Sequence, residues 1–148
     1  EHFLTICEYG AIGNGTSFAM GVAAARPDSR VVLFDDDGSA LMHIQELETM
    51  HRHKMKILIV VMNDGAYGSE IHKLRSEGLS ESGAVFGFSD LAGIARGFGL
   101  HGQTITDVSQ LPAALEELEQ VEGPALWDLR VSDKVVSRIT RQAHPPRS

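Results

Sequence analysis

The most constraining feature of this sequence is a repeated order of segments: a short apolar run, a glycine-rich or acidic turn at its end, and then a helical stretch. This order is typical of βα units, which build parallel sheets covered by helices. We expect strands at residues 3–7, 31–34, 57–62, 101–105 and 125–131, and helices at 16–25, 40–53, 90–97 and 109–120. The second and third runs are nearly continuous in apolar residues, which predicts central strands covered on both faces. The fold class that follows is a three-layer α/β/α domain with a mainly parallel sheet.

The remaining segments carry no clear period. Residues 69–89 hold three glycines and five serines, which predicts a long loop or a mobile lid. We expect one domain over residues 1–138 and a frayed tail over 139–148. Because the sequence enters an apolar segment at Glu1 without a methionine, we expect the chain to be a piece of a longer protein.

Composition excludes several classes of partner. Thirteen Lys and Arg residues face 20 Asp and Glu residues, and the formal net charge of −7 argues against a nucleic-acid surface. No apolar run approaches the roughly 18 residues that a membrane span needs, so we expect no membrane segment. The single cysteine, Cys7, cannot form an internal disulfide, which favours a cytoplasmic location.

Three of the turns carry groups that bind ions. They are Gly-Ala-Ile-Gly-Asn-Gly at 10–15, Asp-Asp-Asp-Gly-Ser at 35–39 and Asn-Asp-Gly-Ala-Tyr-Gly at 63–68. Ligands of open α/β sheets bind beyond the carboxyl ends of the strands, where such turns meet. Glycine-rich turns present N–H groups to anions, and Asp and Asn oxygens suit Mg²⁺. The turns together predict a magnesium and phosphate site, although each alone has the composition of an ordinary turn.

The spacing of the second and third turns resembles a known motif. Residues 37–39 read Asp-Gly-Ser, and a helix and an apolar strand separate them from Asn63. This resembles the thiamine diphosphate motif, G-D-G, about 25 residues and then Asn, of thiamine diphosphate-dependent decarboxylases and carboligases. Gln-Glu-Leu at 45–47 and Tyr-Gly at 67–68 also match, and the resemblance covers about residues 10–131.

The resemblance implies a site made of side chains and backbone groups. Asp37 and Asn63 would bind Mg²⁺ by side-chain oxygens, and Gly65 would bind it by its carbonyl. The diphosphate would be held by Ser39 and by the backbone amides near Gly38, Ala66 and Tyr67.

The resemblance also gives roles to the first turn, at 10–15, and the sequence departs from the family's motif at one position. The Gly10 carbonyl would accept a hydrogen bond from the cofactor's 4′-amino group, and the stiff Ile12 side chain would hold the cofactor bent. Asp36 stands where the family has its first glycine. A carboxylate there repels a diphosphate unless it points away or lies beside the metal, so it bears on cofactor affinity.

The resemblance also implies partners. In that family this thiamine diphosphate-binding fold provides half of an active site, and a pyrimidine-binding domain, usually on a second subunit, provides the glutamate that activates the cofactor. The substrate would be a 2-oxo acid, the assembly a homo- or hetero-oligomer, and the nearest subgroups acetolactate-synthase-like and benzoylformate-decarboxylase-like enzymes. No catalytic residue is assigned within these 148 residues, and we expect the chain alone to be inactive.

The sequence is compatible with two other functions. An apolar strand followed by Asp35-Asp36-Asp37-Gly-Ser also resembles the haloacid-dehalogenase-type phosphotransferases, in which Asp35 would be the nucleophile and Asp37 the general acid. The chain lacks that family's later signals, because the next apolar strand ends in Asn63. A non-catalytic interaction domain that retains the fold is the second alternative.

Overall fold

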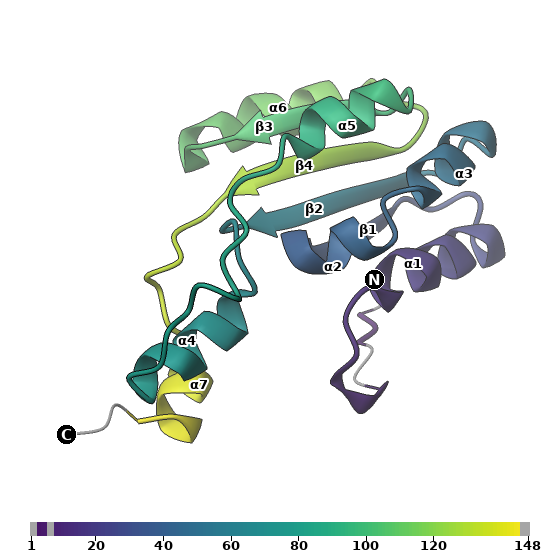
Figure 1. Cartoon of the computed structure of the whole chain (residues 1–148). Helices are drawn as coiled ribbons and strands as arrows, with labels where there is room; N and C mark the ends of the chain where they lie inside the picture. Colours follow the sequence, from purple (N-terminus) through teal and green to yellow (C-terminus); the bar gives the residue numbers. More distant parts are fainter. Residues whose placement is uncertain (1–2, 6–7, 146–148) are drawn as a thin grey trace.

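The computed structural model describes residues 3–5 and 8–145, and its centre is a four-stranded sheet in which all pairings are parallel. The strand order is β1-β2-β4-β3 (Figure 1). The strands are β1 (Val31–Asp36), β2 (Ile57–Asn63), β3 (His101–Ile105) and β4 (Ala125–Arg130). The predicted strands at 31–34, 57–62, 101–105 and 125–131 are therefore confirmed to within two residues at either end.

Helices connect and cover these strands. They are η1 (Glu8–Gly10), α1 (Asn14–Ala25), α2 (Asp37–Met42), α3 (Glu46–Arg52), α4 (Gly68–Ser76), α5 (Leu91–Gly97), η2 (Val108–Gln110), α6 (Leu111–Glu119) and α7 (Arg138–Ala143). Residues 3–5 have no regular secondary structure, so the strand predicted at 3–7 is absent there, and Ile6 and Cys7 lie outside the described residues.

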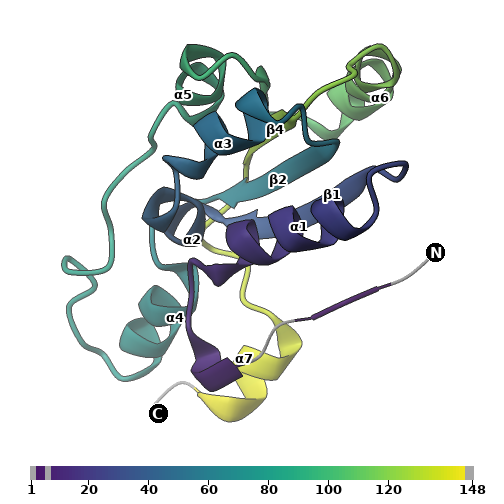
Figure 2. The ribbon, with the colours of Figure 1, turned by 90° about the vertical axis from the view of Figure 1, so that its right-hand side faces the viewer.

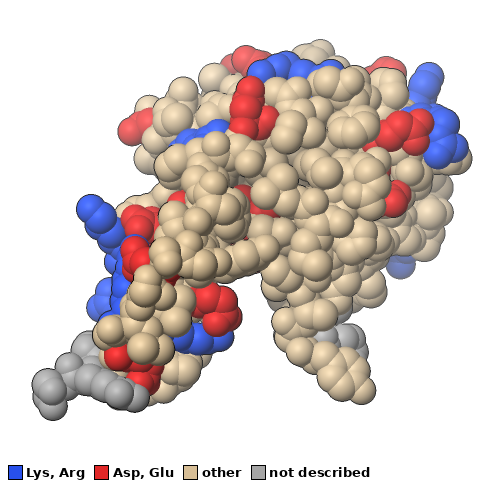
Figure 3. Space-filling model, in the orientation of Figure 1, with Lys and Arg blue, Asp and Glu red and all other residues tan. Residues whose placement is uncertain are grey.

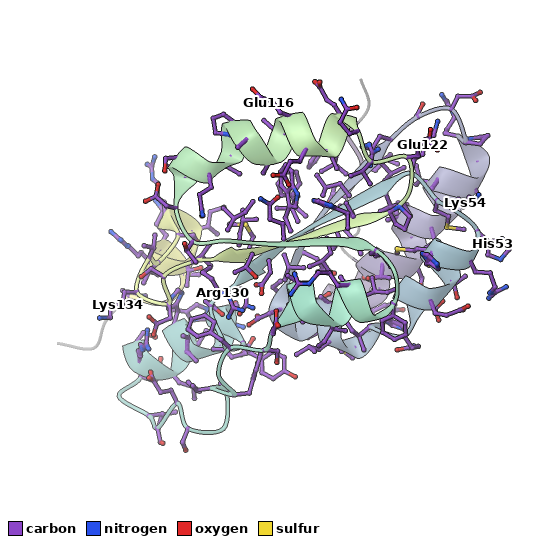
Figure 4. All side chains as sticks on the ribbon, turned by 90° about the horizontal axis from the view of Figure 1, so that it is seen from above. His53, Lys54, Glu116, Glu122, Arg130 and Lys134 are labelled. Carbon is purple, nitrogen blue, oxygen red and sulfur yellow. The ribbon has the colours of Figure 1, made fainter. Side chains whose placement is uncertain are left out.

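The sheet separates two apolar cores, which confirms the three-layer α/β/α class. On one face, residues of α1, α2, α3 and α5 pack against Ile57, Ile59 and Val61 of β2. On the other face, Ala114 and Leu118 of α6 pack against the alternate residues of the strands. Figure 4 shows α6 on one side of the sheet and α5 on the other.

The two continuous apolar runs have different environments. Every residue of β2 except Met62 is buried, because strands and helices surround it, as the sequence predicts. The prediction that the run at 31–34 is also central is wrong: β1 is an edge strand whose burial alternates, and Val32 and Phe34 are exposed. Apolar composition shows that a run is strand-forming but does not show how many neighbours it has.

The predicted helix over 40–53 is two helices. The first, α2, begins earlier, at Asp37, because the Asp36 carboxylate accepts a hydrogen bond from Ser39 N–H and caps the helix. It ends at Met42, and a turn over 43–45 leads into α3. The cap places residues 37–39 in the first turn of a helix and not in the preceding loop.

Two further segments are more ordered than predicted. Residues 69–76 of the predicted loop belong to α4, in which Ile71 is buried and Lys73 pairs with Glu70. A single buried apolar residue leaves almost no helical period in the sequence, which explains the error. Part of the predicted frayed tail forms α7, whose first turn the Ser137 side chain caps by accepting from Thr140 N–H. Pro146 to Ser148 lie outside the described residues.

Helices α4 and α7 lie beyond the carboxyl ends of the strands, beside each other (Figures 1 and 2). Arg75 of α4 donates to Asp133, in the segment between β4 and α7, and to Glu81, in the segment that follows α4. Figure 3 shows Lys and Arg side chains (blue) beside Asp and Glu side chains (red) on the lobe at its lower left. Among the described residues, no helix is long and apolar enough to cross a membrane.

Candidate functional site

Adjacent parallel strands bring two of the predicted turns together. Residue Asp36 at the end of β1 is in register with Met62 of β2, so the turns that follow leave the same edge of the sheet. The first helical turn of α2 therefore lies beside the segment 63–68. Polar groups gather at this edge because the strands end there and their backbone no longer pairs across the sheet.

Asp37 and Asn63 converge on one backbone group. The Gly65 N–H donates to Asp37 Oδ2 at 2.8 Å and to Asn63 Oδ1 at 3.2 Å. Both side chains are buried, at 1% and 0% exposure. The sequence predicts these two residues as metal ligands, and the structure turns an oxygen of each toward the same point.

The buried Asp37 carboxylate lies in an acidic environment. Burial raises its pKa to about 6; the hydrogen bond from Gly65 opposes this shift, and the charges of Asp64 and Asp36 reinforce it. Burial likewise raises the pKa of Asp64. A cation at this position would offset the mutual repulsion of these carboxylates.

The predicted diphosphate donors of α2 already have acceptors within the chain. Ser39 N–H donates to Asp36 Oδ1 at 2.6 Å, and Gly38 N–H donates to Asp37 Oδ1 at 3.0 Å. The Ser39 hydroxyl accepts from Gly13 N–H at 2.8 Å. Asp36 thus points back at the helix that it caps, with its side chain exposed to solvent.

The turn after β2 shows the same pattern. Ala66 N–H donates to Asp64 Oδ1 at 3.1 Å, and Tyr67 N–H donates to a backbone carbonyl, that of Ala84. The Gly65 carbonyl, predicted as a metal ligand, accepts from the backbone amides of Phe86 at 3.1 Å and of Gly87 at 2.8 Å. Residues 84–87 therefore form one wall of the site.

These contacts decide how well the residues fit an anion and a cation. Carboxylates of Asp36, Asp37 and Asp64 accept from the N–H groups predicted to hold a diphosphate, so these groups are placed for anionic oxygens. The Asp37 and Asn63 side-chain oxygens both face the Gly65 N–H, and carboxylate and amide oxygens are the kind of ligand that a hard cation takes. Within the described residues no three His, Cys, Asp or Glu side chains gather for a metal, so any site here depends on the Asn63 amide and on backbone or ligand oxygens.

A cavity of about 550 Å³ adjoins these groups. It is lined by Gly38, Leu41, Met42, Tyr67, Gly83, Phe86 and Ser89. Gly10 and Ile12 are not among its lining residues. Gly10 ends η1 with a φ of 64°, and the Ile12 side chain is 42% exposed. The structure thus brings the second and third turns together, and the first turn touches the second through the bond from Gly13 N–H to Ser39 Oγ, while Gly10 and Ile12 lie outside the cavity lining.

The positions of Asp35 and Asp37 do not suit a shared phosphotransfer site. A β-carbon on Gly15 of α1 would lie 3.3 Å from Asp35 Oδ2, so Asp35 turns toward α1. Asp37 turns toward Gly65, after β2. In the phosphotransferase interpretation both carboxylates would act on one phosphate, and the two side chains instead face different elements.

Sequence reasoning missed one buried pair. Asp128 is fully buried in β4 and pairs with Arg130, whose nitrogen lies 2.7 Å from Asp128 Oδ2. Asp128 Oδ1 also accepts from Asn63 Nδ2 at 2.8 Å. The signal was present, because a carboxylate inside an otherwise apolar strand has to be paired when it is buried.

Comparison with known proteins agrees with this geometry. Residues 1–129 match the family described as "Thiamine pyrophosphate enzyme, C-terminal TPP binding domain". Thiamine pyrophosphate and thiamine diphosphate are two names for one cofactor. The match covers most of the chain and includes both turns that form the site.

Individual relatives are much longer than this chain. It is 31% identical to the acetolactate synthase isozyme 2 large subunit of Escherichia coli (strain K12), over 90% of this chain and 25% of that protein. It is 34% identical to the isozyme 1 large subunit of the same organism, over 88% of this chain and 24% of that one. The chain thus spans about a quarter of the curated relatives that it matches.

A solved structure shares the fold. The thiamine diphosphate-dependent 4-hydroxybenzoylformate decarboxylase of Rhodococcus jostii RHA1 superposes with a TM-score of 0.74 at 26% identity, over 84% of this chain and 24% of that one. These matches do not favour the phosphotransferase alternative. The chain belongs to the family of C-terminal thiamine pyrophosphate-binding domains of thiamine pyrophosphate enzymes.

Proposed function

We propose that this chain holds the diphosphate group of thiamine diphosphate together with a Mg²⁺ ion at the carboxyl ends of β1 and β2. The observation that carries the proposal is the convergence of Asp37 Oδ2 and Asn63 Oδ1 on the Gly65 N–H group. Carboxylate and amide oxygens are suitable ligands for Mg²⁺, which usually binds through one or two protein carboxylates and substrate phosphates.

The metal ligands would be Asp37, Asn63 and the Gly65 carbonyl. The proposal is supported by the two side-chain oxygens that face the Gly65 N–H, whereas the Gly65 carbonyl accepts from the amides of Phe86 and Gly87. Its use as a ligand therefore requires a small shift of residues 86–87. Both donors lie in the irregular segment between α4 and α5, where fewer backbone bonds resist movement than in a helix or strand.

The diphosphate would be held by Ser39 and by the amides of Gly38, Ala66 and Tyr67. The amides of Gly38 and Ala66, together with the Ser39 N–H, donate to carboxylates, and Tyr67 N–H donates to the Ala84 carbonyl. For the first three groups, binding exchanges one set of anionic oxygens for another. Such an exchange adds charge to an acidic site, and Mg²⁺ offsets that charge. This is why cofactor and metal would bind together.

Gly10 and Ile12 would position the rest of the cofactor. The Gly10 carbonyl would accept from the 4′-amino group, and the half-exposed Ile12 side chain would support the bend between the two rings. When bound, thiamine diphosphate supplies the carbon that adds to the carbonyl of a 2-oxo acid and accepts the electrons released by decarboxylation. The residues of this chain bind and orient it.

The substrate, partner and location follow from the longer relatives. We infer a 2-oxo acid decarboxylase or carboligase that needs a pyrimidine-binding domain or subunit, assembled as a homo- or hetero-oligomer in the cytoplasm. Support comes from the relatives' names, two acetolactate synthase large subunits and one decarboxylase, and from the quarter of their length that the chain spans. The binding domain would occupy residues 1–138.

Calorimetry and thermal melting test the proposal. Mg²⁺ and thiamine diphosphate should each raise the melting temperature mainly in the presence of the other, by the linkage of binding to folding. Asn63→Ala should abolish this effect, and Asp107→Asn, which changes a remote capping carboxylate of η2, should not. Tight Mg²⁺ binding whose affinity does not change when thiamine diphosphate is added would contradict the proposal. So would phosphatase activity of the wild-type chain that Asp35→Asn abolishes.

A further inference from the structure

A network of hydrogen bonds surrounds the amide of Asn63. Its Nδ2 atom donates to Asp128 Oδ1 at 2.8 Å and, more weakly, to the Ser89 carbonyl at 3.4 Å. Both partners can only accept hydrogen bonds, so the amide nitrogen has to face them. The Asn63 oxygen is then left on the opposite side, toward Gly65 and Asp37.

Asp128 is placed for this contact by the sheet. Val61 and Asp128 are in register, and side chains two residues apart on a strand share a face, so Asn63 and Asp128 are diagonal neighbours on one face. Figure 4 labels Arg130, which lies on the same face near the ends of the strands. Its Nη2 atom donates to Asp128 Oδ2 at 2.7 Å and to the Ser89 carbonyl at 2.9 Å.

Arg130 determines which oxygen of the Asp128 carboxylate is free to accept from Asn63. The guanidinium group lies 4.8 Å from the centre of the Phe88 ring, which holds it over the segment that precedes α5. The guanidinium group donates to one oxygen of the Asp128 carboxylate, and the other oxygen accepts from Asn63. The carboxylate is fully buried, so it has no solvent to exchange with, and each of its oxygens keeps one protein partner.

We propose that Asp128 is a positioning residue for metal binding: by accepting from Asn63 Nδ2 it keeps the Asn63 oxygen turned toward the cation. The inference rests on the proposed metal site. An amide has two chemically different ends of nearly equal size, so a metal ligand of this kind needs a partner that distinguishes them. Asp128 makes the distinction because a carboxylate cannot donate.

The variant Asp128→Asn tests this orientation with almost no change of volume. The new amide would offer its oxygen to Arg130, because the charge-assisted bond is the stronger one. Its NH₂ group would then face residue 63, and the Asn63 amide would have to turn its oxygen away from Gly65. Loss of a group that orients a metal ligand typically weakens metal affinity about 10- to 100-fold, and we expect a loss in this range.

The measurement is Mn²⁺ binding to the chain in the presence of thiamine diphosphate, followed by electron paramagnetic resonance. The double variant Asn63→Asp/Asp128→Asn provides the decisive rescue. A carboxylate at 63 accepts from the new amide with one oxygen and presents the other to the metal, so most of the affinity should return. Asp133→Asn is the matched control, since it removes a carboxylate that pairs with Arg75 elsewhere. Melting temperatures without metal verify that each variant folds.

Each outcome has a distinct meaning. Weak binding in Asp128→Asn with recovery in the double variant supports the inference. Unchanged binding in a folded Asp128→Asn chain overturns it, and so does a folded double variant that binds as weakly as the single one, because the defect is then not one of orientation. If the wild-type chain binds no Mn²⁺ with thiamine diphosphate, the proposed metal site itself fails, and the inference fails with it.

Discussion

Gly38 lies directly against the ring of Tyr67. A β-carbon added to Gly38 would come within 2.5 Å of Tyr67 Cε1, closer than non-bonded carbon atoms approach. The Tyr67 ring in turn packs edge-on against Phe86, with the ring centres 5.2 Å apart. The first turn of α2, the turn after β2 and the wall at 84–87 are thereby joined at one point.

This contact predicts that Gly38→Ala destabilises the domain, by about 1–3 kcal/mol in the free energy of unfolding, because the methyl group displaces the Tyr67 ring. Chemical denaturation measures the change. Gly21→Ala is the control, since Gly21 is a helix residue of α1 with no atom within 4 Å of the added carbon, and it should be neutral or stabilising. In a Tyr67→Ala background Gly38→Ala should cost nothing; a persistent cost would show that the ring is not the obstacle.

The two-sided burial of β2 predicts unequal effects of truncating leucines. Leu58, at 3% exposure, packs against α6, and Leu58→Ala should lower the free energy of unfolding by about 2–4 kcal/mol through the cavity that it leaves. Leu115 of α6 is 53% exposed, and Leu115→Ala should change the free energy of unfolding by less than about 0.5 kcal/mol. Urea denaturation compares the two. Equal losses would contradict the assigned register of α6 on the sheet.

The ion pair between Arg75 and Asp133, which lies in the segment before α7, predicts that the attachment of α7 depends on pH. Hydrogen bonds from Arg75 lower the pKa of Glu81 and of Asp133. A carboxylate with a lowered pKa stabilises the folded state above its ordinary pKa, and this contribution is lost as the pH falls through the lowered value. Hydrogen exchange of α7 amides, corrected for intrinsic rates, should therefore accelerate below about pH 4.

The variant Arg75→Gln isolates that effect. It should accelerate exchange in α7 already at pH 7 and remove most of the additional acceleration in acid. Arg52→Gln is the control, because Arg52 pairs with Glu48 within α3, away from α7. Exchange in α7 that is unaltered by Arg75→Gln would show that apolar packing alone holds this helix.

The proposed function predicts that the chain alone, saturated with thiamine diphosphate and Mg²⁺, does not decarboxylate pyruvate or benzoylformate. A general acid has to reach its acceptor within about 3 Å or through one water. The glutamates of the chain, among them Glu46 in α3 and Glu70 in α4, belong to the domain that we propose binds the diphosphate, not to a pyrimidine-binding domain. Product assays with and without an added pyrimidine-binding domain measure the difference. Turnover at an enzymatic rate by the purified chain, its mass verified, would contradict the prediction.

Most of the fold could be predicted from local sequence. Burial and backbone preference can be read from residues that are close in sequence. The continuous apolar run of β2, the βα order and the turn residues after β1 and β2 are such local signals. The same turns carry Asp37 and Asn63, and the sheet had only to be parallel for them to meet. The spacing of these two residues, through its resemblance to a known motif, also indicates the cofactor.

The remaining features depended on contacts between distant segments. Nothing within 31–36 shows that β1 pairs with β2 alone among the strands of the described residues, and one buried isoleucine, Ile71, is too little pattern to identify α4. The pairing of Asn63 with Asp128 joins residues 65 positions apart. Sequence by itself determined which turns carry the carboxylate, amide and N–H groups that suit a cation and a diphosphate, because these groups are properties of the individual residues. Only the tertiary structure decided how Asn63 is oriented, because a buried amide takes the direction that its packed neighbours impose.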